Sequence, residues 1–194
     1  MKDMRDFITK AEEAGILKRI KAKVDWNLEL SHIAKLNEEQ QGPALLFENV
    51  KDYKTPVITS VCTTTERLAL IMGLPKDSSL TDLYKEWARL GENLVPPKWV
   101  DAANAPCKEN ILTGKKIDLY KFPVPHYYPL DGGRYFGTAH FIISKDPDTG
   151  WVNLGTYRSQ LLGKDKLGTQ FIKGKHADIM NTNRRFSDDE RKIV

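Results

Sequence analysis

A β-hairpin is the clearest structural signal in this sequence, and it lies in residues 135–160, which read YFGTAHFIISKDPDTGWVNLGTYRSQ. Apolar, aromatic and β-branched residues dominate residues 135–144 and 151–160, as is typical of strands. The six residues between these runs, KDPDTG, combine aspartate, proline and glycine, which favour turns. We therefore predict two strands joined by a hairpin turn.

A domain boundary is predicted near residue 105. Residues 111–133, which precede the hairpin, contain short apolar runs, three prolines and the turn Asp131-Gly132-Gly133. Before them, residues 96–110 begin with two prolines and have the composition of a linker. We expect an α/β domain over residues 1–105 and a β-rich domain over residues 106–194, which gives an α/β (α+β) fold class for the chain.

Helices and strands alternate in the first domain. Asp3 and the spacing of the apolar residues after it predict a helix that Gly15 ends. Residues 17–24 alternate between apolar and basic side chains and predict a half-exposed strand, and Asn27 is expected to cap the next helix. Short buried strands are expected at residues 44–47 and 57–62.

Two capping motifs predict the last helices of this domain. Thr63-x-x-Glu66 and Ser79-x-x-Asp82 each place a hydroxyl three residues before a carboxylate, as in a capping box. Gly73 is expected to close the first of these helices. The second helix carries an apolar stripe that we expect to face the core. Its members are Leu80, Leu83, Tyr84, Trp87 and Leu90.

Composition and charge argue against several classes of protein. The chain has 194 residues, 40% of them hydrophobic, which suits one or two globular domains rather than disorder. No apolar run approaches the ~20 residues of a membrane-spanning helix, and the N-terminus lacks the apolar segment of a secretory signal, so we expect a cytoplasmic protein without a membrane partner. Cys62 and Cys107 stand far apart and are expected to be reduced thiols. A net charge of +4 is small for a nucleic-acid-binding protein, and no nucleic-acid partner is expected.

Motifs of the common phosphate and hydrolase sites are missing from the sequence. Gly163 and Gly168 have the spacing of a phosphate-binding loop but lack the lysine that should follow, and no Gly-x-Gly-x-x-Gly follows a strand. The four histidines form no His-Glu-x-x-His pair, which argues against a zinc hydrolase. No Gly-x-Ser-x-Gly elbow is present.

Two polar residues in the second strand-like run, Asn153 and Arg158, are the remaining candidates for chemistry. Their odd spacing puts them on opposite faces of a regular strand. They can serve one site only if the strand bends, and Gly155 permits a bulge or bend between them. From the residues alone, a half-exposed hairpin strand with an edge arginine is the stronger interpretation.

Four motifs stand in one order and at one spacing along the chain. They are Pro43-Ala-Leu-Leu-Phe-Glu-Asn-Val50, Asp131-Gly-Gly133, Asn153-x-Gly-x-Tyr-Arg158-x-Gln160 and Gly163-Lys-Asp-Lys-Leu-Gly168. Together they resemble the UbiD-like decarboxylases. Enzymes of this family use prenylated FMN to remove CO2 from, or add it to, aromatic and α,β-unsaturated acids. The resemblance runs along essentially the whole chain. It implies the N-terminal part of such a carboxy-lyase, with an α/β domain followed by the opening strands of a split β-barrel that binds the flavin.

The resemblance also implies roles for individual residues. Asn153 matches a family ligand of a divalent ion, Mn2+ or Mg2+, that bridges to the flavin phosphate, and His176 matches a second metal ligand; K+ is a further ion of such sites. An amide oxygen suits these ions, and one imidazole is compatible with Mn2+. The start of a helix over residues 176–185 is the structural alternative for His176. The residues implied to contact the flavin are Thr156, Tyr157, Arg158, Gln170, Phe171, Ile172, Lys175 and His176.

Arg158 is the residue to which the resemblance implies a catalytic role. Decarboxylation leaves an electron pair on carbon that no ordinary side chain accepts, and the modified flavin supplies that electron sink. A guanidinium can hold the substrate carboxylate through a bidentate fork. In the family the arginine acts with carboxylates, one of which supplies the proton that replaces CO2.

Members of the family are much longer than this chain. We expect the third metal ligand, a glutamate, the catalytic acidic residues and the domain with the dimer contacts to lie beyond Val194, so that the chain alone is inactive. The alternative is a non-catalytic accessory subunit whose partner chain completes the site. A third and weaker alternative is a nucleic-acid-binding module built on Lys173, Lys175, Arg184 and Arg185. If the chain is part of such a carboxy-lyase, the expected partners are a small aromatic or unsaturated carboxylic acid, CO2 and further copies of the chain in a homo-oligomer.

Overall fold

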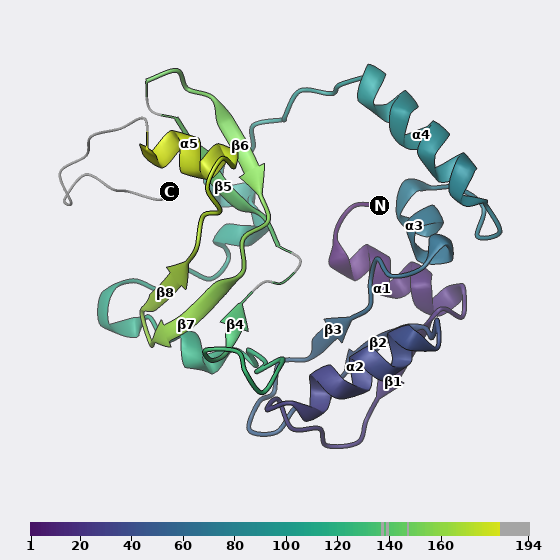
Figure 1. The fold of residues 1–194 in the computed structure, drawn as a ribbon, viewed down its shortest axis with the longest axis horizontal. Helices are drawn as coiled ribbons and strands as arrows, with labels where there is room; N and C mark the ends of the chain where they lie inside the picture. The colour runs from purple at the N-terminus through teal and green to yellow at the C-terminus, as the bar shows by residue number, and fades with distance from the viewer. Residues whose placement is uncertain (137, 139, 147, 183–194) are drawn as a thin grey trace. The chain divides into compact units, whose positions relative to one another are not determined.

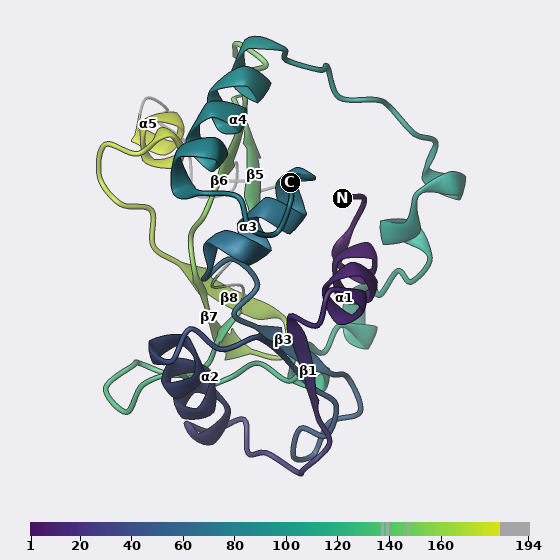
Figure 2. The same cartoon turned by 90° about the vertical axis from the view of Figure 1, so that its right-hand side faces the viewer.

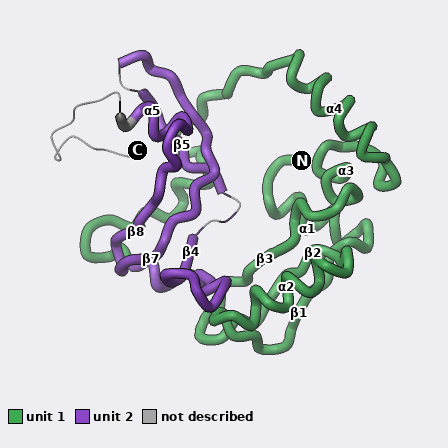
Figure 3. Tube along the Cα trace, viewed as in Figure 1, with its two compact units in different colours: residues 1–117 green, residues 118–194 purple. Residues whose placement is uncertain are grey.

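The computed structural model describes residues 1–136, 138, 140–146 and 148–182. The chain divides into two compact units, residues 1–117 and residues 118–194, which are coloured separately in Figure 3. Among the residues described, no helix has the length and apolar character needed to cross a membrane. Arg184, Arg185 and the end of the helix expected over residues 176–185 lie outside the described residues.

Unit 1 is built on a small mixed sheet (Figure 1). Its strands are β1 (Leu17–Ile20), β2 (Ala44–Phe47) and β3 (Val57–Thr59), in the order β1-β2-β3. β1 pairs with β2 in parallel, with Leu17 opposite Ala44, whereas β3 pairs with β2 antiparallel. The connection between the two parallel strands contains α2 (Glu29–Glu39), as parallel pairing requires a long crossover. All four residues of β2 are buried, which explains its uninterrupted apolar sequence.

Two apolar clusters form the core of unit 1. One combines residues of β2 with the loop before α2 and that helix, and its buried members are Val24, Leu30, Leu45, Phe47 and Val50. The other combines α1 (Met4–Glu13) with β2 and the residue before β1, and its buried members are Phe7, Ala11, Ile16 and Ala44. The helical spacing of Phe7 and Ala11 therefore marks the buried face of α1, as the sequence predicts.

Most of the predicted helix boundaries in unit 1 are confirmed. Asp3 caps α1 by accepting a hydrogen bond from the Asp6 backbone N–H. Gly73 ends α3 (Thr65–Met72) in the left-handed conformation, with φ at 77°. Ser79 and Asp82 form the complete capping box of α4 (Leu80–Glu92).

Two predicted caps are each displaced by one residue. The N-cap of α2 is Leu28 rather than Asn27, because the loop before this helix is closed around Asp25. The Asp25 carboxylate accepts from the Asn27 N–H, and its own backbone N–H donates to the Glu29 carboxylate. The cap of α3 is Thr64 rather than Thr63.

Thr63 is displaced from the capping role because its hydroxyl accepts a hydrogen bond from Arg67. Arg67 is only 1% exposed, and its guanidinium also donates to the Gly42 carbonyl at 2.8 Å. Burial lowers the pKa of Arg67 because the charged form is desolvated. This side chain thus joins α3 to the loop between α2 and β2.

The apolar stripe of α4 does not form a core face, which corrects the sequence prediction. Leu83 is 5% exposed, whereas Tyr84 and Trp87 are 69% and 72% exposed, and Leu80 and Leu90 are exposed as well. In Figures 1 and 2, α4 follows directly on α3, the element that it contacts most. A helix of eight residues cannot cover the apolar side of a helix of thirteen residues. After α4, residues 94–100 have no regular structure.

Short 3-10 helices accompany the passage from unit 1 to unit 2. They are η1 (Ala102–Asn104), η2 (Pro106–Lys108), η3 (Gly114–Lys116) and η4 (Leu119–Lys121).

Besides η4, the described residues of unit 2 form two small antiparallel sheets and one short α-helix. These elements are β4 (Tyr135–Phe136), β5 (Ile142–Lys145), β6 (Val152–Gly155), β7 (Ser159–Gly163), β8 (Lys166–Thr169) and α5 (His176–Thr182). One sheet has the order β4-β7-β8, and β5 and β6 form the other. The α/β fold class expected from the sequence is confirmed by the elements of the two units.

The predicted hairpin is β5 and β6. Asp146 closes its turn, since its carboxylate accepts from two backbone N–H groups and its own N–H donates to the Trp151 carbonyl at 2.7 Å. Gly150 takes a φ of 74°, which glycine adopts without strain. The two long strands expected on either side are wrong in extent, because each run divides between the two sheets. Residues 135–144 supply β4 and the start of β5, and residues 151–160 supply β6 and the start of β7.

Candidate functional site

The segment Thr156–Arg158 carries the chain from one sheet of unit 2 to the other. β6 ends at Gly155, and β7 begins at Ser159. A bend therefore lies between Asn153 on β6 and Arg158 before β7, which is the condition under which the two could serve one site. Glycine is needed at its start, because a Cβ on Gly155 would overlap the Tyr157 ring.

Tyr157 anchors this bend in the interior of unit 2. Its side chain is 7% exposed, and its ring meets the Phe171 ring edge-on, with centroids 5.0 Å apart. Aromatic pairs favour this arrangement. The backbone on either side of Tyr157 is thereby fixed, and the side chains of Thr156 and Arg158 lie at the surface.

A pocket of about 480 Å3 opens beside the bend. Among the residues that the resemblance implies to contact flavin, the ones that line it are Thr156, Tyr157, Arg158, Gln170 and Ile172. Phe171 packs against Tyr157 instead of lining the pocket, and Lys175 and His176 are also outside its lining. The structure thus gathers five of the eight residues around one cavity.

Four lining residues were missed by the sequence reasoning: Tyr135, Gln160, Gly168 and Thr169. Gln160 and Gly168 are part of the family motifs quoted above, and this membership could have marked them as site residues. Tyr135 faces the pocket because β4 pairs with β7, where it lies opposite Gln160. Thr169 lies opposite Ser159 in the β7–β8 pair, and their hydroxyls are 2.7 Å apart.

Arg158 is held at the pocket by two contacts. Its Nη1 donates to Asp131 Oδ1 at 3.0 Å, and its Cζ lies 4.2 Å from the centroid of the Tyr135 ring. The Arg158 side chain is nevertheless 52% exposed, so it remains accessible to a ligand. Asp131 was a motif residue without an assigned role, since a pairing across 27 residues leaves no local pattern in the sequence.

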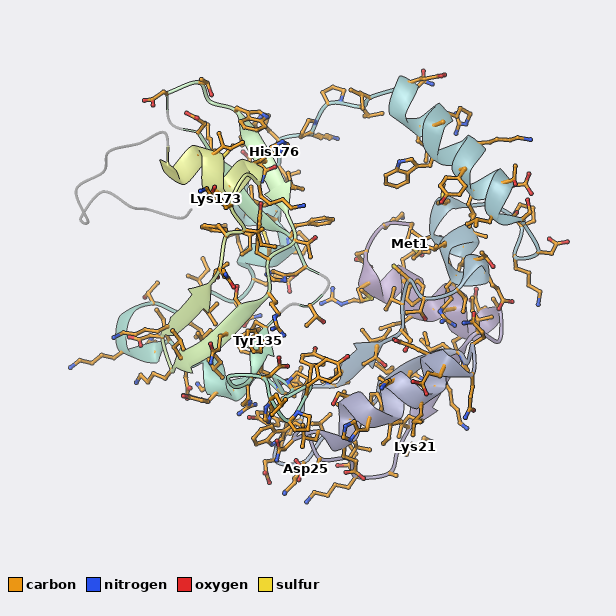
Figure 4. The ribbon with its side chains drawn as sticks, viewed as in Figure 1. Met1, Lys21, Asp25, Tyr135, Lys173 and His176 are labelled. Carbon is orange, nitrogen blue, oxygen red and sulfur yellow. The ribbon has the colours of Figure 1, made fainter. Side chains whose placement is uncertain are left out.

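Asn153 and His176, the two predicted metal ligands, are brought together. Asn153 Oδ1 and His176 Nδ1 are 3.0 Å apart, although 23 residues separate them in the chain. His176 is the first residue of α5. Figure 4 labels both His176 and Tyr135 of β4. The Trp151 ring packs on the imidazole with centroids 4.8 Å apart. His176 therefore lies beside the other predicted metal ligand, and it also begins a helix, as the structural alternative expects.

The chemistry of this pair fits a divalent cation. Asn153 is 9% exposed, and its Nδ2 has no hydrogen-bond acceptor among the described residues. One amide oxygen and one imidazole nitrogen are a donor set that Mn2+ accepts. In the described part of the chain, no three His, Cys, Asp or Glu side chains form a metal-binding group. A cation held here would thus need ligands in addition to Asn153 and His176.

The aromatic run before the turn at Asp131 has a structural environment of its own. None of His126, Tyr127 and Tyr128 lines the pocket. Burial raises the pKa of Tyr127, whose hydroxyl accepts a hydrogen bond from Thr138 at 3.3 Å. Its phenol therefore remains protonated at neutral pH.

Two family models match the chain. The model described as 3-octaprenyl-4-hydroxybenzoate carboxy-lyase N-terminal domain matches residues 8–87. The model described as 3-octaprenyl-4-hydroxybenzoate carboxy-lyase Rift-related domain matches residues 98–191. The second match includes the pocket, the Asn153–His176 pair and Asp131.

Solved structures agree with the family models. The UbiD-class enzyme HmfF from Pelotomaculum thermopropionicum, in complex with FMN, is 33% identical over 92% of this chain, with a TM-score of 0.80. An evolved dimeric form of that enzyme, in complex with prFMN, is 32% identical over 92% of the chain, with a TM-score of 0.82. The closed form of vanillic acid decarboxylase from Sedimentibacter hydroxybenzoicus is 32% identical over 89% of the chain, with a TM-score of 0.83. The present chain spans 38%, 40% and 37% of these three chains.

Proposed function

The chain belongs to the UbiD family of carboxy-lyases, and from this premise we propose that it is the N-terminal part of an enzyme that reversibly decarboxylates an aromatic or α,β-unsaturated acid. The cofactors proposed are prenylated FMN and a divalent metal, Mn2+ or Mg2+. Residues 1–105 are assigned to the N-terminal α/β domain and residues 106–194 to part of the flavin-binding domain.

The pocket beside the Gly155 bend is the observation that carries the proposal. Five of its lining residues are ones that the family resemblance implies to contact flavin. Two of the similar structures are complexes with FMN and with prFMN. Pockets of roughly 300–1,000 Å3 are typical of small-molecule sites, and this one has about 480 Å3.

The chain's own residues would bind and orient the substrate, the flavin and the cation. Arg158 presents a half-exposed guanidinium whose remaining N–H donors can hold a carboxylate. Tyr157, packed on Phe171, would form a buried part of the pocket wall. When bound, prenylated FMN supplies the electron sink for the pair released with CO2. Asn153 and His176 would hold the cation through an amide oxygen and an imidazole nitrogen.

Flavin titration tests the assignment of the pocket. FMN and prenylated FMN, each with Mn2+, are added to the 194-residue chain while flavin fluorescence is recorded. Thr156→Trp should fill the pocket and weaken binding at least tenfold, because the side chain of Thr156 lines it. Thr113→Trp is the matched control, since Thr113 is exposed in unit 1. Equal flavin affinities for the two variants would contradict the assignment.

Turnover tests the role of Arg158. In an enzyme that completes the family fold, Arg158→Ala should abolish decarboxylation and leave flavin bound. Turnover close to that of the wild type would refute a catalytic role for this arginine.

A non-catalytic accessory subunit is the second candidate. It is favoured by the observation that the described residues bring together the two predicted metal ligands and no group of three His, Cys, Asp or Glu. Co-purification with a polypeptide that carries acidic residues for the same cation would support it. Release of CO2 from an added aromatic or α,β-unsaturated acid by the 194-residue chain, with prenylated FMN and Mn2+ but no partner polypeptide, would exclude it.

A further inference from the structure

Asp131 is a nearly buried carboxylate in the turn before β4. Its side chain is 10% exposed, and Oδ1 accepts the hydrogen bond from Arg158 Nη1. Oδ2 is buried and receives no hydrogen bond from any residue in the described ranges. Burying a carboxylate is costly unless a cation lies close to it. Over the same ranges, Arg158 is the cation within ion-pair distance of Asp131.

The turn that carries Asp131 is fixed to β7, the strand that begins directly after Arg158. The Gln160 side chain donates to the Gly132 carbonyl at 2.6 Å, and the Leu161 N–H donates to the Arg134 carbonyl at 2.8 Å. A Cβ on Gly132 would lie only 3.2 Å from the Gln160 amide nitrogen. The carboxylate is thus a rigid anchor whose place is set by the same strand that sets the place of Arg158.

The Arg158 guanidinium is restrained in two different ways. The ion pair with Asp131 holds one terminal nitrogen, and the Tyr135 ring supports the guanidinium through a cation–π contact. Nε and Nη2 donate to no described residue, and the side chain lines the pocket. These two nitrogens are therefore the donors left for an anionic ligand.

We propose that Asp131 is a positioning residue for Arg158: it holds Nη1 so that Nε and Nη2 are presented to a carboxylate in the pocket. The role of Arg158 in this statement rests on the proposed function. The anchoring contact itself does not, and it can be measured without flavin or substrate.

Arginine modification tests the anchor. Phenylglyoxal condenses with the two terminal nitrogens of a guanidino group, and the hydrogen bond to Asp131 occupies one of them, Nη1, which slows the reaction. Asp131→Ala should raise the modification rate of Arg158 about three- to tenfold. The rate is measured by peptide mass mapping. Asp131→Asn keeps an oxygen acceptor and should restore part of the protection. The control variant Asp165→Asn removes an exposed carboxylate of the β7–β8 turn and should change nothing. An unchanged rate at Arg158 in Asp131→Ala would overturn the proposal.

Kinetics of the complete enzyme test positioning against a merely structural role. Asp131→Ala should lower kcat/KM at least tenfold with unchanged flavin affinity and unchanged unfolding temperature. Asp131→Asn, which keeps an oxygen acceptor for Arg158 Nη1, should recover part of the lost kcat/KM, as it recovers part of the protection. Wild-type kcat/KM in Asp131→Ala would overturn the proposal even if modification becomes faster. An enzyme that never decarboxylates, yet shows the faster modification, would refute the proposed function and leave the anchor established.

Discussion

Replacing Gly155 by alanine should destabilise unit 2 through one identifiable collision. The new Cβ would come within 3.0 Å of three atoms at the far edge of the Tyr157 ring, namely Cε2, Cζ and the hydroxyl oxygen. The backbone itself accepts alanine, because Gly155 is not among the glycines with a positive φ. The ring cannot swing away freely, since it is 7% exposed and packed on Phe171.

The magnitude follows from these contacts. Overpacking costs about 1–3 kcal/mol, and loss of the edge-on ring contact costs about 0.5–1.5 kcal/mol more. We therefore expect Gly155→Ala to lower the free energy of unfolding by about 2–4 kcal/mol, measured by urea denaturation followed by circular dichroism. Gly91→Ala in α4 is the control, where nothing lies within 4 Å of the new Cβ and a gain of about 0.5–1 kcal/mol is expected.

A double mutant decides whether the ring is responsible. Leucine at position 157 lacks the atoms that the Gly155 Cβ would meet. In a Tyr157→Leu background, Gly155→Ala should therefore cost less than about 0.5 kcal/mol. The reasoning is refuted if the substitution costs as much in that background as in the wild type.

Three further outcomes are expected in unit 1. Arg67→Ala should cost about 3–5 kcal/mol, because it leaves both a cavity and unpaired acceptors. Arg67→Met leaves the same acceptors unpaired but keeps the volume, and it should cost less; calorimetry that ranks the two equally would contradict this. Leu83→Ala should cost about 2–4 kcal/mol and Trp87→Ala less than about 0.5 kcal/mol, since only the former is buried; reversed unfolding midpoints would show that the stripe is covered. A hydrogen bond from Arg19 lowers the pKa of Glu12 below its ordinary value of 4.5. The ionised Glu12 carboxylate therefore stabilises the folded state above that pH, and this contribution is lost as the pH falls through the lowered pKa. The stability difference between wild type and Glu12→Gln should accordingly shrink below pH 4.5, and a difference that grows on acidification would contradict the assignment.

Local chemistry let the sequence predict most of the helix ends and the hairpin. The Asp3 cap, the Ser79–Asp82 box and the left-handed Gly73 each depend on residues within one helical turn, so their patterns are complete in the sequence. The hairpin at residues 145–150 is similarly local. The errors at Asn27 and Thr63 arose where a nearby side chain competed for the same groups.

The resemblance of ordered motifs also identified the family, and the matches to residues 8–87 and 98–191 confirm that assignment. It further supplied residues whose roles remain predictions. The structure adds their geometry: Asn153 meets His176, and five of the residues implied to contact flavin surround one pocket.

The sequence by itself determined most of the helix ends, the hairpin turn and the glycine that permits a bend between Asn153 and Arg158. Only the tertiary structure decided which side chains meet across long separations, as Asp131 meets Arg158, and which apolar faces are covered, as the exposed stripe of α4 shows. The physical reason is that a cap or a turn depends on neighbours along the chain. An ion pair or a buried face depends instead on which distant element packs against it, and no local pattern records that choice.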